Sequence, residues 1–478
     1  MLTIIYRAVA SVLLVLPLSV NALTVDDWFE DFKRSATDEE LYSFLYALPK
    51  GGDLHNHLTG SNFSEWWYEL ATHPEQNGGY RYYTRVTIEN CAQYGSDMFG
   101  FSPYLMYFRN IQESGFNQLS DCEKSEYKRL EDLTEQEKDG WLNSLRLDKS
   151  HESRDEFFQT HWQRLNDLTA NPHLVAQTLY LNMQAFAREG VTYLESIQGM
   201  RGFKKPDGSE YDPDTVADIF RDRLNQADAR QTGVTVRLQY YLLRFIPNAE
   251  EDLAWIYHFV DRHRDLFVGI NMVGREDNDK GYPLRFLPVL RSLRQKIPTI
   301  PLAIHAGEVD EPNHHVRDTL LLGASRIGHG VNLISDPDTL LMMRNSEYLV
   351  EINLISNLLL QYVNDFSEHP FPEYLRLGIP VALSTDDRGM WDSNLTDEYF
   401  VAVKEFNLSW RELVSLGRNS LRFSFLDDAS KADLLDEYEQ RVGKFSKAFQ
   451  RKGLPALQGT TPVSYGFSCR YYSVCLQP

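Results

Sequence analysis

The sequence is poor in basic residues, in cysteine and in long apolar segments. Lysine and arginine number 48 against 68 acidic residues, which gives a net charge of −20. We expect neither nucleic acid nor an anionic membrane as a partner, because both repel an acidic protein. After residue 22, no stretch approaches the length of apolar chain that spans a bilayer. Hydrophobic residues make up 42% and aromatic residues 13%, enough to build a sizeable core.

The one long apolar run lies at the N-terminus. It covers residues 8–20, follows the single positive charge of Arg7 and ends in the small-residue pattern Val-Asn-Ala at 20–22. This pattern is typical of a signal peptide cut after residue 22, and the run is short for a membrane span and interrupted by Pro17. An uncleaved anchor is the alternative. We therefore expect a secreted or periplasmic protein with no membrane contact after cleavage.

Only four cysteines are present: Cys91, Cys122, Cys469 and Cys475. In an oxidising compartment an even number suggests disulfides. We expect cysteines that are neighbours in sequence to pair, Cys91 with Cys122 and Cys469 with Cys475. Four free buried thiols are the alternative.

Between residues 52 and 387 the chain alternates short apolar runs with longer stretches of helical spacing. The eight apolar runs cover residues 52–58, 191–196, 235–243, 267–274, 300–308, 326–333, 348–357 and 379–387. Several are rich in β-branched residues and too short for helices, which is typical of buried parallel strands. Eight strand–helix units are what a (β/α)8 TIM barrel requires. A doubly wound sheet, the alternative, would show a glycine-rich turn after its first strand, and the sequence has none.

Two regions depart from this repeat. Residues 75–150 are polar and hold the first two cysteines, which favours an insertion after the first strand. The chain after residue 395 is helical in pattern and ends in a tail with the other two cysteines. We expect a signal peptide over residues 1–22 and a single catalytic barrel domain over 23–478, with an insertion at 75–150 and a C-terminal helical region at 395–478.

Two histidines lie one residue apart in "GDLHNHL" (52–58), and residues at this spacing on a strand, His55 and His57, face the same way. Further polar side chains close three later strands: His305 and Glu308, His329, and Asp386 with Asp387. In a barrel the C-terminal strand ends gather on one face, where active sites are built. Three histidines and a carboxylate can meet there around one divalent ion. Nitrogen and oxygen ligands with an open position suit catalytic zinc.

The remaining residues indicate hydrolysis. A zinc-bound water becomes a usable nucleophile near neutral pH. Glu308 lies three residues beyond His305, so it can reach a substrate, and a carboxylic acid kept protonated can donate to a ring nitrogen. Glycines flank His329 and leave room for a ligand or water. Asp386 and Asp387 are neighbours, so one can bind metal while the other turns to the substrate.

The motifs "PKGGDLHNHL", "HAGE", "RIGHG" and "STDD", in this order, resemble those of the adenosine deaminase family of the amidohydrolase superfamily. "VGREDN" (273–278), "ISN" (355–357), the signal peptide and the insertion resemble its secreted branch, the adenosine deaminase-related growth factors. The resemblance covers residues 50–58 and 190–390 well. It implies one zinc ion per chain and hydrolytic release of ammonia from adenosine or a closely related adenine nucleoside. The secreted branch also suggests a homodimer.

The resemblance gives each matching residue a role. It implies that zinc is bound by His55, His57, His305 and Asp386. Glu308 matches the acid that protonates the purine, and His329 matches the residue that orients and deprotonates the zinc water. Asp387 matches the carboxyl that meets this water or the imidazole-ring nitrogen of the purine. Gly274 matches a backbone donor to the purine.

Two positions depart from the family pattern. Thr59 in "HNHLTG" stands where members with an aspartate contact the ribose hydroxyls, and Arg388 replaces the common proline after "STDD". Both changes are expected at the sugar end of a nucleoside, so they leave the exact substrate open. Glu195 and Asn357 are further candidate substrate contacts. A salt bridge inside the barrel is the alternative role of Glu195.

Other functions were weighed against this one. Some amidohydrolases cut amides or esters with two metals bridged by a carbamylated lysine on the fourth strand, but "FVGINMVG" (267–274) contains no lysine. Adenine or a modified nucleoside could replace adenosine as the substrate. A secreted nucleoside-binding or growth-factor-like protein is the third alternative, and the intact set of candidate catalytic residues argues against a purely binding role.

Overall fold

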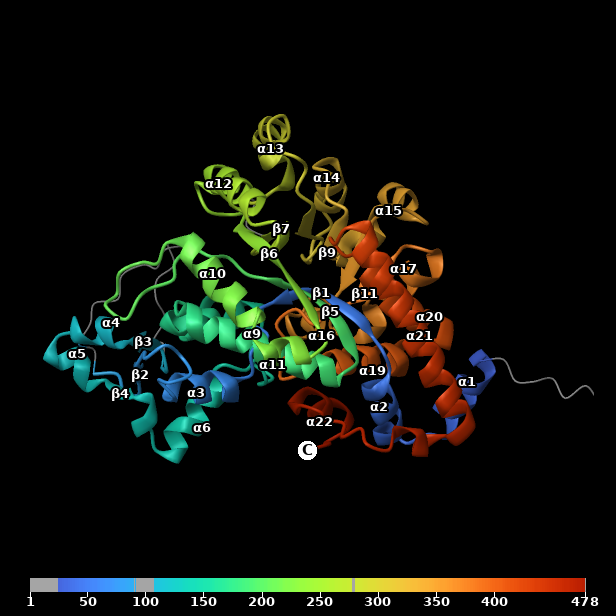
Figure 1. The fold of residues 1–478 in the computed structure, drawn as a ribbon, viewed down its shortest axis with the longest axis horizontal. Helices are drawn as coiled ribbons and strands as arrows, with labels where there is room; N and C mark the ends of the chain where they lie inside the picture. The colour runs from blue at the N-terminus through green and yellow to red at the C-terminus, as the bar shows by residue number, and fades with distance from the viewer. Residues whose placement is uncertain (1–24, 90, 92–106, 277–279, 478) are drawn as a thin grey trace, which may run out of the picture.

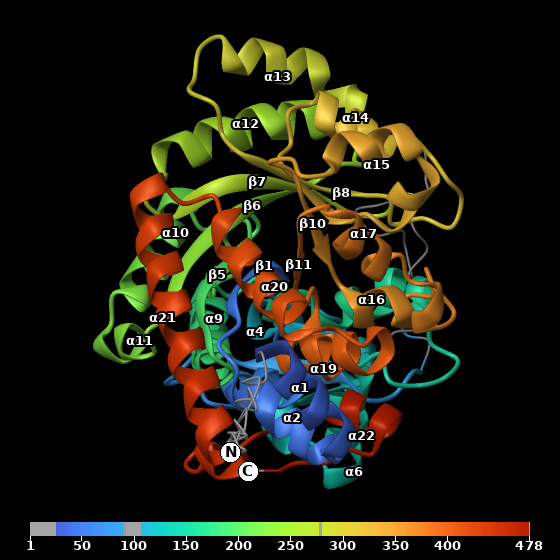
Figure 2. The ribbon, with the colours of Figure 1, turned by 90° about the vertical axis from the view of Figure 1, so that its right-hand side faces the viewer.

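The computed structural model describes residues 25–89, 91, 107–276 and 280–477. The expected signal peptide, residues 1–22, lies outside these ranges. At the centre, eight parallel strands form a barrel in the order β1-β5-β6-β7-β8-β9-β10-β11, with helices around it (Figures 1 and 2). The predicted (β/α)8 barrel is confirmed.

Each barrel strand overlaps one of the eight predicted runs. The strands are β1 (Gly51–His57), β5 (Val191–Ile197), β6 (Thr235–Leu243), β7 (Phe267–Val273), β8 (Leu302–Ala306), β9 (Arg326–His329), β10 (Leu349–Ile352) and β11 (Val381–Leu383). The last four are shorter than their predicted runs, and the chain leaves the extended conformation where they end. His329 and Asp386 have left-handed φ angles of 64° and 53°. The run after β10 turns into helix α16 (Leu354–Leu359).

The barrel closes where β1 meets β11. Asn56 and Asp386 form a parallel bridge, and the His57 N–H donates to the Asp386 carbonyl at 3.0 Å. Below this bridge, the carboxylate of Asp53 accepts hydrogen bonds from the backbone N–H of Thr385 at 3.1 Å and from its hydroxyl at 2.7 Å. These contacts bring the histidines of the first strand against the aspartates of the last.

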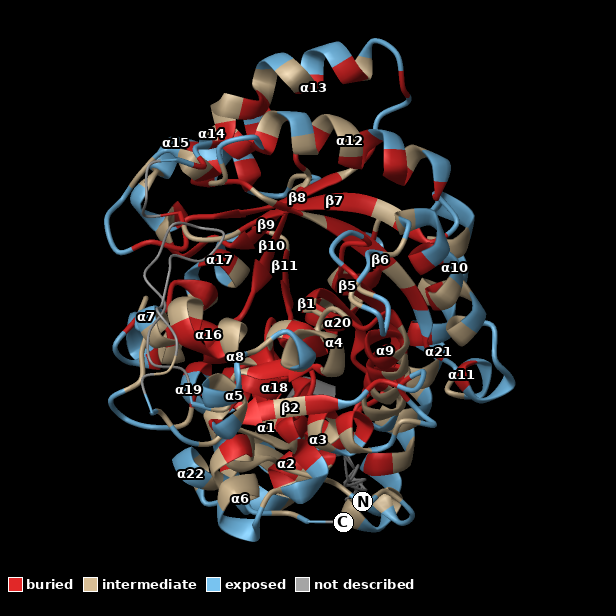
Figure 3. Ribbon diagram, turned by 90° about the vertical axis from the view of Figure 1, so that its left-hand side faces the viewer, coloured by how far each residue is buried: buried red, intermediate tan, exposed pale blue. Residues whose placement is uncertain are grey.

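An outer ring of helices covers the strands. It comprises α9 (Pro172–Arg188), α10 (Pro213–Leu224), α11 (Ala227–Gln231), α12 (Ala249–Arg262), α13 (Leu287–Arg294), α14 (His315–Leu321), α15 (Pro337–Met343), α17 (Phe371–Leu377), α18 (Arg388–Trp391), α19 (Leu395–Phe406), α20 (Trp410–Arg422) and α21 (Asp428–Lys452). Helix α12 shows the pattern: Leu253, Ile256 and Val260 share one buried stripe. In Figure 3 the strands are mostly buried, while the outer faces of the helices are exposed. Helix α20 packs across β1 and β11 and covers the seam (Figure 2).

The N-terminal helices α1 (Val25–Ser35) and α2 (Asp38–Ala47) pack on the C-terminal helices through aromatic rings. The ring of Phe449 in α21 lies 5.2 Å from that of Trp28 and 4.8 Å from that of Phe44. This contact ties the beginning of the described chain to its last long helix.

The predicted insertion holds a small antiparallel sheet, which the sequence did not lead us to expect. Its strands, in the order β3-β2-β4, are β2 (Tyr82–Arg85), β3 (Asn110–Gln112) and β4 (Tyr127–Arg129). Around it lie α3 (Ser64–Thr72), α4 (Glu113–Asn117), α5 (Asp121–Ser125) and α6 (Glu135–Ser144), at the left of Figure 1. The predicted disulfide between Cys91 and Cys122 is present.

The second predicted disulfide, between Cys469 and Cys475, is also present and involves the last helix, α22 (Gly466–Tyr472). Within the described ranges, no helix is both long and apolar enough to cross a bilayer.

Candidate metal centre

The side chains of four predicted ligands meet at the C-terminal ends of β1, β8 and β11. They are His55, His57, His305 and Asp386, and one donor atom of each lies within 4.8 Å of the others. The Nε2 atom of His57 lies 3.2 Å from Nε2 of His305 and 3.2 Å from Oδ1 of Asp386. The Nε2 atom of His55 lies 3.4 Å from the same oxygen. Three nitrogens and one oxygen therefore point into one small volume, a donor set suited to a divalent cation such as zinc.

The back edges of two of these rings are held by polar side chains from neighbouring strands. Oε2 of Glu351 on β10 lies 2.7 Å from Nδ1 of His55, and Oδ1 of Asn271 on β7 lies 3.0 Å from Nδ1 of His305. Donation from Nδ1 leaves each Nε2 lone pair free for a metal. In the described structure Nε2 of His55 is buried without a hydrogen-bond partner. Such an atom is costly in a folded protein, and a bound cation would satisfy it.

The electrostatics of this group also favour a cation. Burial opposes the charged form of His55, but the adjacent carboxylates of Asp386 and Glu351 outweigh it and raise the pKa of His55 to about 10. Burial also opposes the charged form of Asp386, yet hydrogen bonds with His55 and His57 bring the pKa of Asp386 well below its ordinary value. The Ser356 hydroxyl donates to Oδ2 of Asp386 at 2.7 Å, which leaves Oδ1 toward the rings.

Two further carboxyl groups, Glu308 and Asp387, lie beside the cluster. Burial, together with the charges of Asp386 and Glu276, raises the pKa of Glu308 well above its ordinary value. This environment favours the protonated form of Glu308, which can donate a proton. Burial and the neighbouring carboxylates raise the pKa of Asp387 in the same way. Its Oδ1 is buried without a partner in the described structure and lies against Gly60, where a Cβ would collide with it.

Asp387 does not cap the helix that follows it. Asp387 precedes α18, but its side chain accepts no hydrogen bond from the first turn of that helix. Its carboxyl group therefore stays available to the site.

His329 stands next to the same group. Its ring centroid lies 5.0 Å from that of His55 and 5.1 Å from that of His305, and its Nε2 lies 3.6 Å from Oε1 of Glu308. Behind the ring, Asn357 donates to Nδ1 at 3.0 Å. Asn357 is fully buried, so it supports His329 from behind rather than facing the open side of the site. A contact of Asn357 with the substrate stays a prediction.

Sequence reasoning missed Glu276, a buried carboxylate in the "VGREDN" motif. Its Oε2 accepts the backbone N–H of Glu308 at 2.8 Å. Its Oε1 accepts the N–H of Gly307 at 3.1 Å and lies 2.6 Å from Nδ1 of His315. Glu276 thus holds the turn that carries Glu308. The acidic residue after "VGR" was the only available signal, and Asp277 beside it made that signal ambiguous.

Gly274 follows β7 with a φ of 96°, a conformation that favours glycine. A Cβ at this position would collide with the ring of Phe245. The buried guanidinium of Arg244 donates to the Gly274 carbonyl at 3.0 Å and 2.6 Å. The peptide at Gly274 is therefore fixed from one side, which suits its predicted role as a backbone contact to a ligand.

Glu195 does not join the cluster. Its Oε1 accepts hydrogen bonds from the Tyr193 hydroxyl at 2.7 Å and the Phe425 N–H at 2.6 Å. Its Oε2 accepts from Gln239 at 3.0 Å and from Arg326 at 2.8 Å. Both oxygens are occupied inside the barrel, so the structure supports the salt bridge and not the substrate contact.

Arg388 also lies away from the expected sugar end. Its guanidinium pairs with Glu189 at 3.1 Å, donates to Asn182 at 2.8 Å and lies 3.8 Å from the ring centroid of Phe186. The side chain is fully buried against α9. The expectation that Arg388 affects the substrate end is therefore corrected: it is a buried structural residue.

Thr59 and one residue that the sequence analysis missed lie close to the open side of the cluster. Thr59 is half-buried in the turn after β1, and the described structure shows no hydrogen bond of its hydroxyl. Trp162, which begins helix α8 (Trp162–Leu165), has its ring 6.4 Å from that of His57. A chain of aromatic residues in 157–162 was the only sequence signal for this segment.

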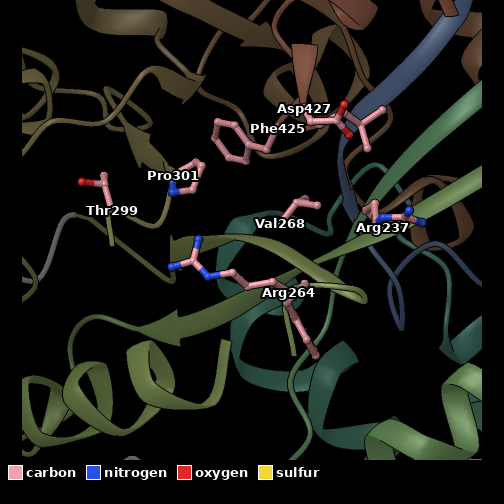
Figure 4. A pocket seen from close by; sticks show the side chains of 9 residues that line it. Arg237, Arg264, Val268, Thr299, Pro301, Phe425 and Asp427 are labelled. Atoms are coloured by element: carbon pink, nitrogen blue, oxygen red, sulfur yellow. The ribbon is translucent and has the colours of Figure 1, made fainter. Parts of the chain in front are cut away.

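A separate cavity of about 390 Å³ lies at the other end of the barrel (Figure 4). It is lined by Arg237, Arg264, Phe267, Val268, Thr299, Pro301, Phe425, Leu426 and Asp427. Arg237, Phe267 and Pro301 lie at or just before the N-terminal ends of β6, β7 and β8. The cavity is therefore separated from the metal-ligand group by the length of the strands.

The fold and the site define a metal-dependent aminohydrolase of the amidohydrolase superfamily. The profile of the adenosine deaminase family matches residues 122–441, two thirds of the chain, and the protein belongs to this family.

Relatives and solved structures agree with this assignment. An adenosine deaminase-like protein of Drosophila melanogaster is 27% identical over 284 residues, which are 59% of this chain and 80% of that protein. Adenosine deaminase 2-A of Danio rerio is 24% identical over 438 residues, 86% of this chain and 82% of its own. The crystal structure of an amidohydrolase with bound zinc from Burkholderia ambifaria superimposes with a TM-score of 0.60 at 18% identity, covering 86% and 96% of the two chains.

Proposed function

We propose that the protein is a zinc-dependent aminohydrolase that converts adenosine or a closely related adenine nucleoside to the inosine-type product and ammonia. The observation that carries the proposal is the buried Glu308 beside four converging metal ligands, in a member of the adenosine deaminase family. The names of the Drosophila and Danio relatives support adenosine as the substrate type. The zinc-bound structural neighbour and the donor set support zinc.

The ligands would be His55, His57, His305 and Asp386, and the chemistry that zinc supplies when bound is a lowered pKa of water, which makes water a nucleophile near pH 7. Glu308 donates a proton to the ring nitrogen beside the carbon that carries the amino group, which makes this carbon electrophilic. The backbone at Gly274 positions the purine. Asp387 holds a hydrogen bond to the water or the purine through its unpaired Oδ1, and His329 orients the water through Nε2.

The sugar end of the substrate is read by a different set of groups. Thr59 offers a hydroxyl without a partner in the described structure, and Trp162 offers an apolar surface. Thr59 itself, unlike an aspartate at this position, has no carboxylate to bind a ribose diol. We therefore propose that this end tolerates variation in the sugar, and that adenosine, deoxyadenosine, 5′-modified adenosine and free adenine form the panel to test.

The test is ammonia release by the purified mature chain, residues 23–478, loaded with zinc and supplied with each compound of this panel. We expect turnover of at least one adenine nucleoside, and none by a folded Glu308→Gln variant. Full activity of that variant, or no release from any compound by the metal-loaded protein, contradicts the proposal.

Metal counting and binding measurements separate the alternatives. One zinc per chain supports the proposal, whereas two ions favour an amide- or ester-cleaving amidohydrolase, against which β7 without lysine already argues. Tight nucleoside binding without turnover would favour a secreted binding or growth-factor-like protein.

We further propose export of the protein, supported by its two disulfides, and a homodimer, which the resemblance to the secreted branch suggests. N-terminal sequencing of the secreted product should begin at residue 23. Sedimentation of the mature chain should give twice the chain mass, and a monomer at micromolar concentration would contradict the dimer.

A further inference from the structure

Three buried side chains form a hydrogen-bonded relay that runs from His369 through Asn357 to His329. His369, which precedes α17, has its Nε2 atom 3.0 Å from Oδ1 of Asn357 in α16. Asn357 in turn has its Nδ2 atom 3.0 Å from Nδ1 of His329. All three side chains are almost completely buried. His369 belongs to no motif of the sequence analysis, and it lies too far from the metal-ligand group to touch a substrate there.

A backbone N–H group decides which atoms of this relay donate and which accept. The N–H of Phe371, which can only donate, reaches Nδ1 of His369 at 3.1 Å. Nδ1 of His369 therefore carries no proton, and its Nε2 carries one. The Nε2–H donates to the oxygen of Asn357, so the amide nitrogen of Asn357 must face His329.

The same logic fixes the proton on His329. The amide nitrogen of Asn357 can only donate, so Nδ1 of His329 accepts and the proton of the neutral ring is on Nε2. Nε2 is the atom that faces Glu308. The other amide beside this ring, Asn353, gives its nitrogen to the carbonyl oxygens of Ser384 at 3.2 Å and Ile352 at 3.3 Å. Its oxygen therefore faces the ring edge, 3.3 Å from Nδ1 and 3.5 Å from Nε2 of His329, and the proton on Nε2 can donate to it.

We propose that His369 and Asn357 are positioning residues that hold His329 as the tautomer with its proton on Nε2, so that His329 donates a hydrogen bond to the reacting oxygen. The inference rests on the proposed function and refines it. Family resemblance implies that His329 also takes up the proton of the attacking water. A ring that carries hydrogen on Nε2, and accepts a hydrogen bond on Nδ1, has no free lone pair to receive that proton, so the proton passes instead to the carboxylate of Asp387, whose Oδ1 has no partner in the described structure.

Burial also keeps the far end of the relay neutral, since it lowers the pKa of His369 to about 3. A second proton on His369 would also place an N–H against the N–H of Phe371. The relay therefore keeps one order of hydrogen-bond donors and acceptors, and the fold fixes this order.

The test changes Asn357, the middle residue of the relay, from a donor to an acceptor toward His329. Asn357→Asp keeps the shape of the side chain but replaces the donor facing His329 with an acceptor, so the proton of His329 should move to Nδ1. Histidine-selective 15N labelling reports the tautomer, because protonated and bare ring nitrogens resonate in separate ranges. A His329→Asn variant assigns the resonance. Both zinc-loaded and metal-free protein are measured.

We expect a bare Nδ1 and a protonated Nε2 on His329 in the natural sequence, and the reverse in Asn357→Asp. The kcat of this variant should fall by about tenfold to a hundredfold, the range for residues that orient a catalytic group, with KM and zinc content little changed. A proton on Nδ1 in the natural sequence, or an unchanged tautomer in a folded Asn357→Asp, overturns the inference.

Two variants of His369 and one control test whether a loss of activity comes from the relay or from disturbed packing. His369→Phe removes the donor to Asn357 and should lower kcat in the same way, whereas His369→Gln restores a side-chain donor and should recover part of it. His263→Phe replaces another buried histidine, at the C-terminal end of α12 and outside the relay, and should leave kcat unchanged. Equal losses in all three would show a general packing effect and contradict the inference.

The spectroscopic result does not depend on the substrate. If no adenine compound is turned over but His329 carries its proton on Nε2, the proposed function fails and the relay stands. If the enzyme is active and His329 carries its proton on Nδ1, the relay fails alone.

Discussion

At the scale of single residues, the chemistry depends on carboxyl groups that share one buried space in different protonation states. Asp386 stays ionised because hydrogen bonds with His55 and His57 oppose the effect of burial. Glu308 and Asp387 lack such donors, and the charge of Asp386 adds to burial in raising their pKa values. A charged ligand and a neutral acid can therefore lie side by side in the site.

Glu308→Gln tests the acid directly. Glutamine keeps the size of the side chain but has no proton to give to the purine nitrogen, so kcat should fall by about 10²- to 10⁴-fold. Zinc content and the thermal unfolding temperature should match those of the natural sequence. Ammonia release within about tenfold of that sequence, from a folded and metal-loaded variant, would remove Glu308 from its role.

Glu276→Gln tests the support beneath this acid. The carboxylate of Glu276 accepts the N–H groups of Gly307 and Glu308, and an amide can satisfy only one of these donors well. The turn should shift, and kcat should fall about tenfold to a hundredfold with zinc content retained. Glu311→Gln, an exposed change on the same loop, serves as the control. Equal kcat in the two variants would make Glu276 a purely structural acid.

The pH dependence of activity follows from the same pair. Glu308 acts in its protonated form, so kcat/KM should fall on the alkaline side as pH rises through its raised pKa. The charge of Glu276 contributes to this rise, so Glu276→Gln should move the alkaline limb to lower pH. A pH–rate profile of both proteins measures the shift, and a limb that moves to higher pH would contradict the assignment.

At the scale of elements, the sequence predicted all eight barrel strands because their apolar runs are buried on both faces. It missed β2, β3 and β4, because strands of three or four residues in a polar segment carry almost no periodic signal. It also extended β9, β10 and β11 too far, because the residues at their ends leave the extended conformation for a tertiary reason: their side chains must face the metal-ligand group.

The candidate site was also predictable from the sequence only in part. The four ligands were predictable because each closes a strand within a short motif. Glu351, Asn271 and His369 were not, because each acts on a histidine 34 to 296 residues away or through an intermediate side chain. A polar residue inside an apolar strand, as in "GINM" and "VEIN", was their only local signal. Arg388 shows the opposite error. Its motif suggested a residue near the substrate, but its side chain packs against α9.

Lys50 joins two helices to the first barrel strand. Its buried Nζ donates to the carbonyls of Leu45 at 2.5 Å, near the end of α2, and of Glu189 at 2.6 Å, just after α9. Lys50→Met should lower the free energy of unfolding by about 1–3 kcal/mol, because buried carbonyls lose their hydrogen-bond donor. Lys404→Met, which breaks the exposed pair with Asp38, should cost under about 1 kcal/mol. Urea unfolding measures both, and equal losses would contradict the capping role.

At the scale of the whole molecule, the metal-ligand group lies at the seam that closes the barrel. Its ligands come from β1, β8 and β11, and β1 and β11 are the two strands that meet last around the ring. The bridge between Asn56 and Asp386 and the contact of Asp53 with Thr385 are the polar links of this seam. A cation bound there would connect strands that the backbone ladder joins only briefly.

Removal of the metal should therefore destabilise the barrel as well as abolish activity. Binding to the folded state alone adds about 4 kcal/mol at a free zinc concentration of 1,000 times Kd, so chelation should lower the thermal unfolding temperature by several degrees. Added zinc should restore it. Hydrogen exchange should increase first in β1 and β11, the strands of the seam. His55→Ala should remove the zinc-dependent shift, whereas His258→Ala, on the exposed face of α12, should retain it. A zinc-dependent rise that persists in a folded His55→Ala variant would place the metal elsewhere in the protein.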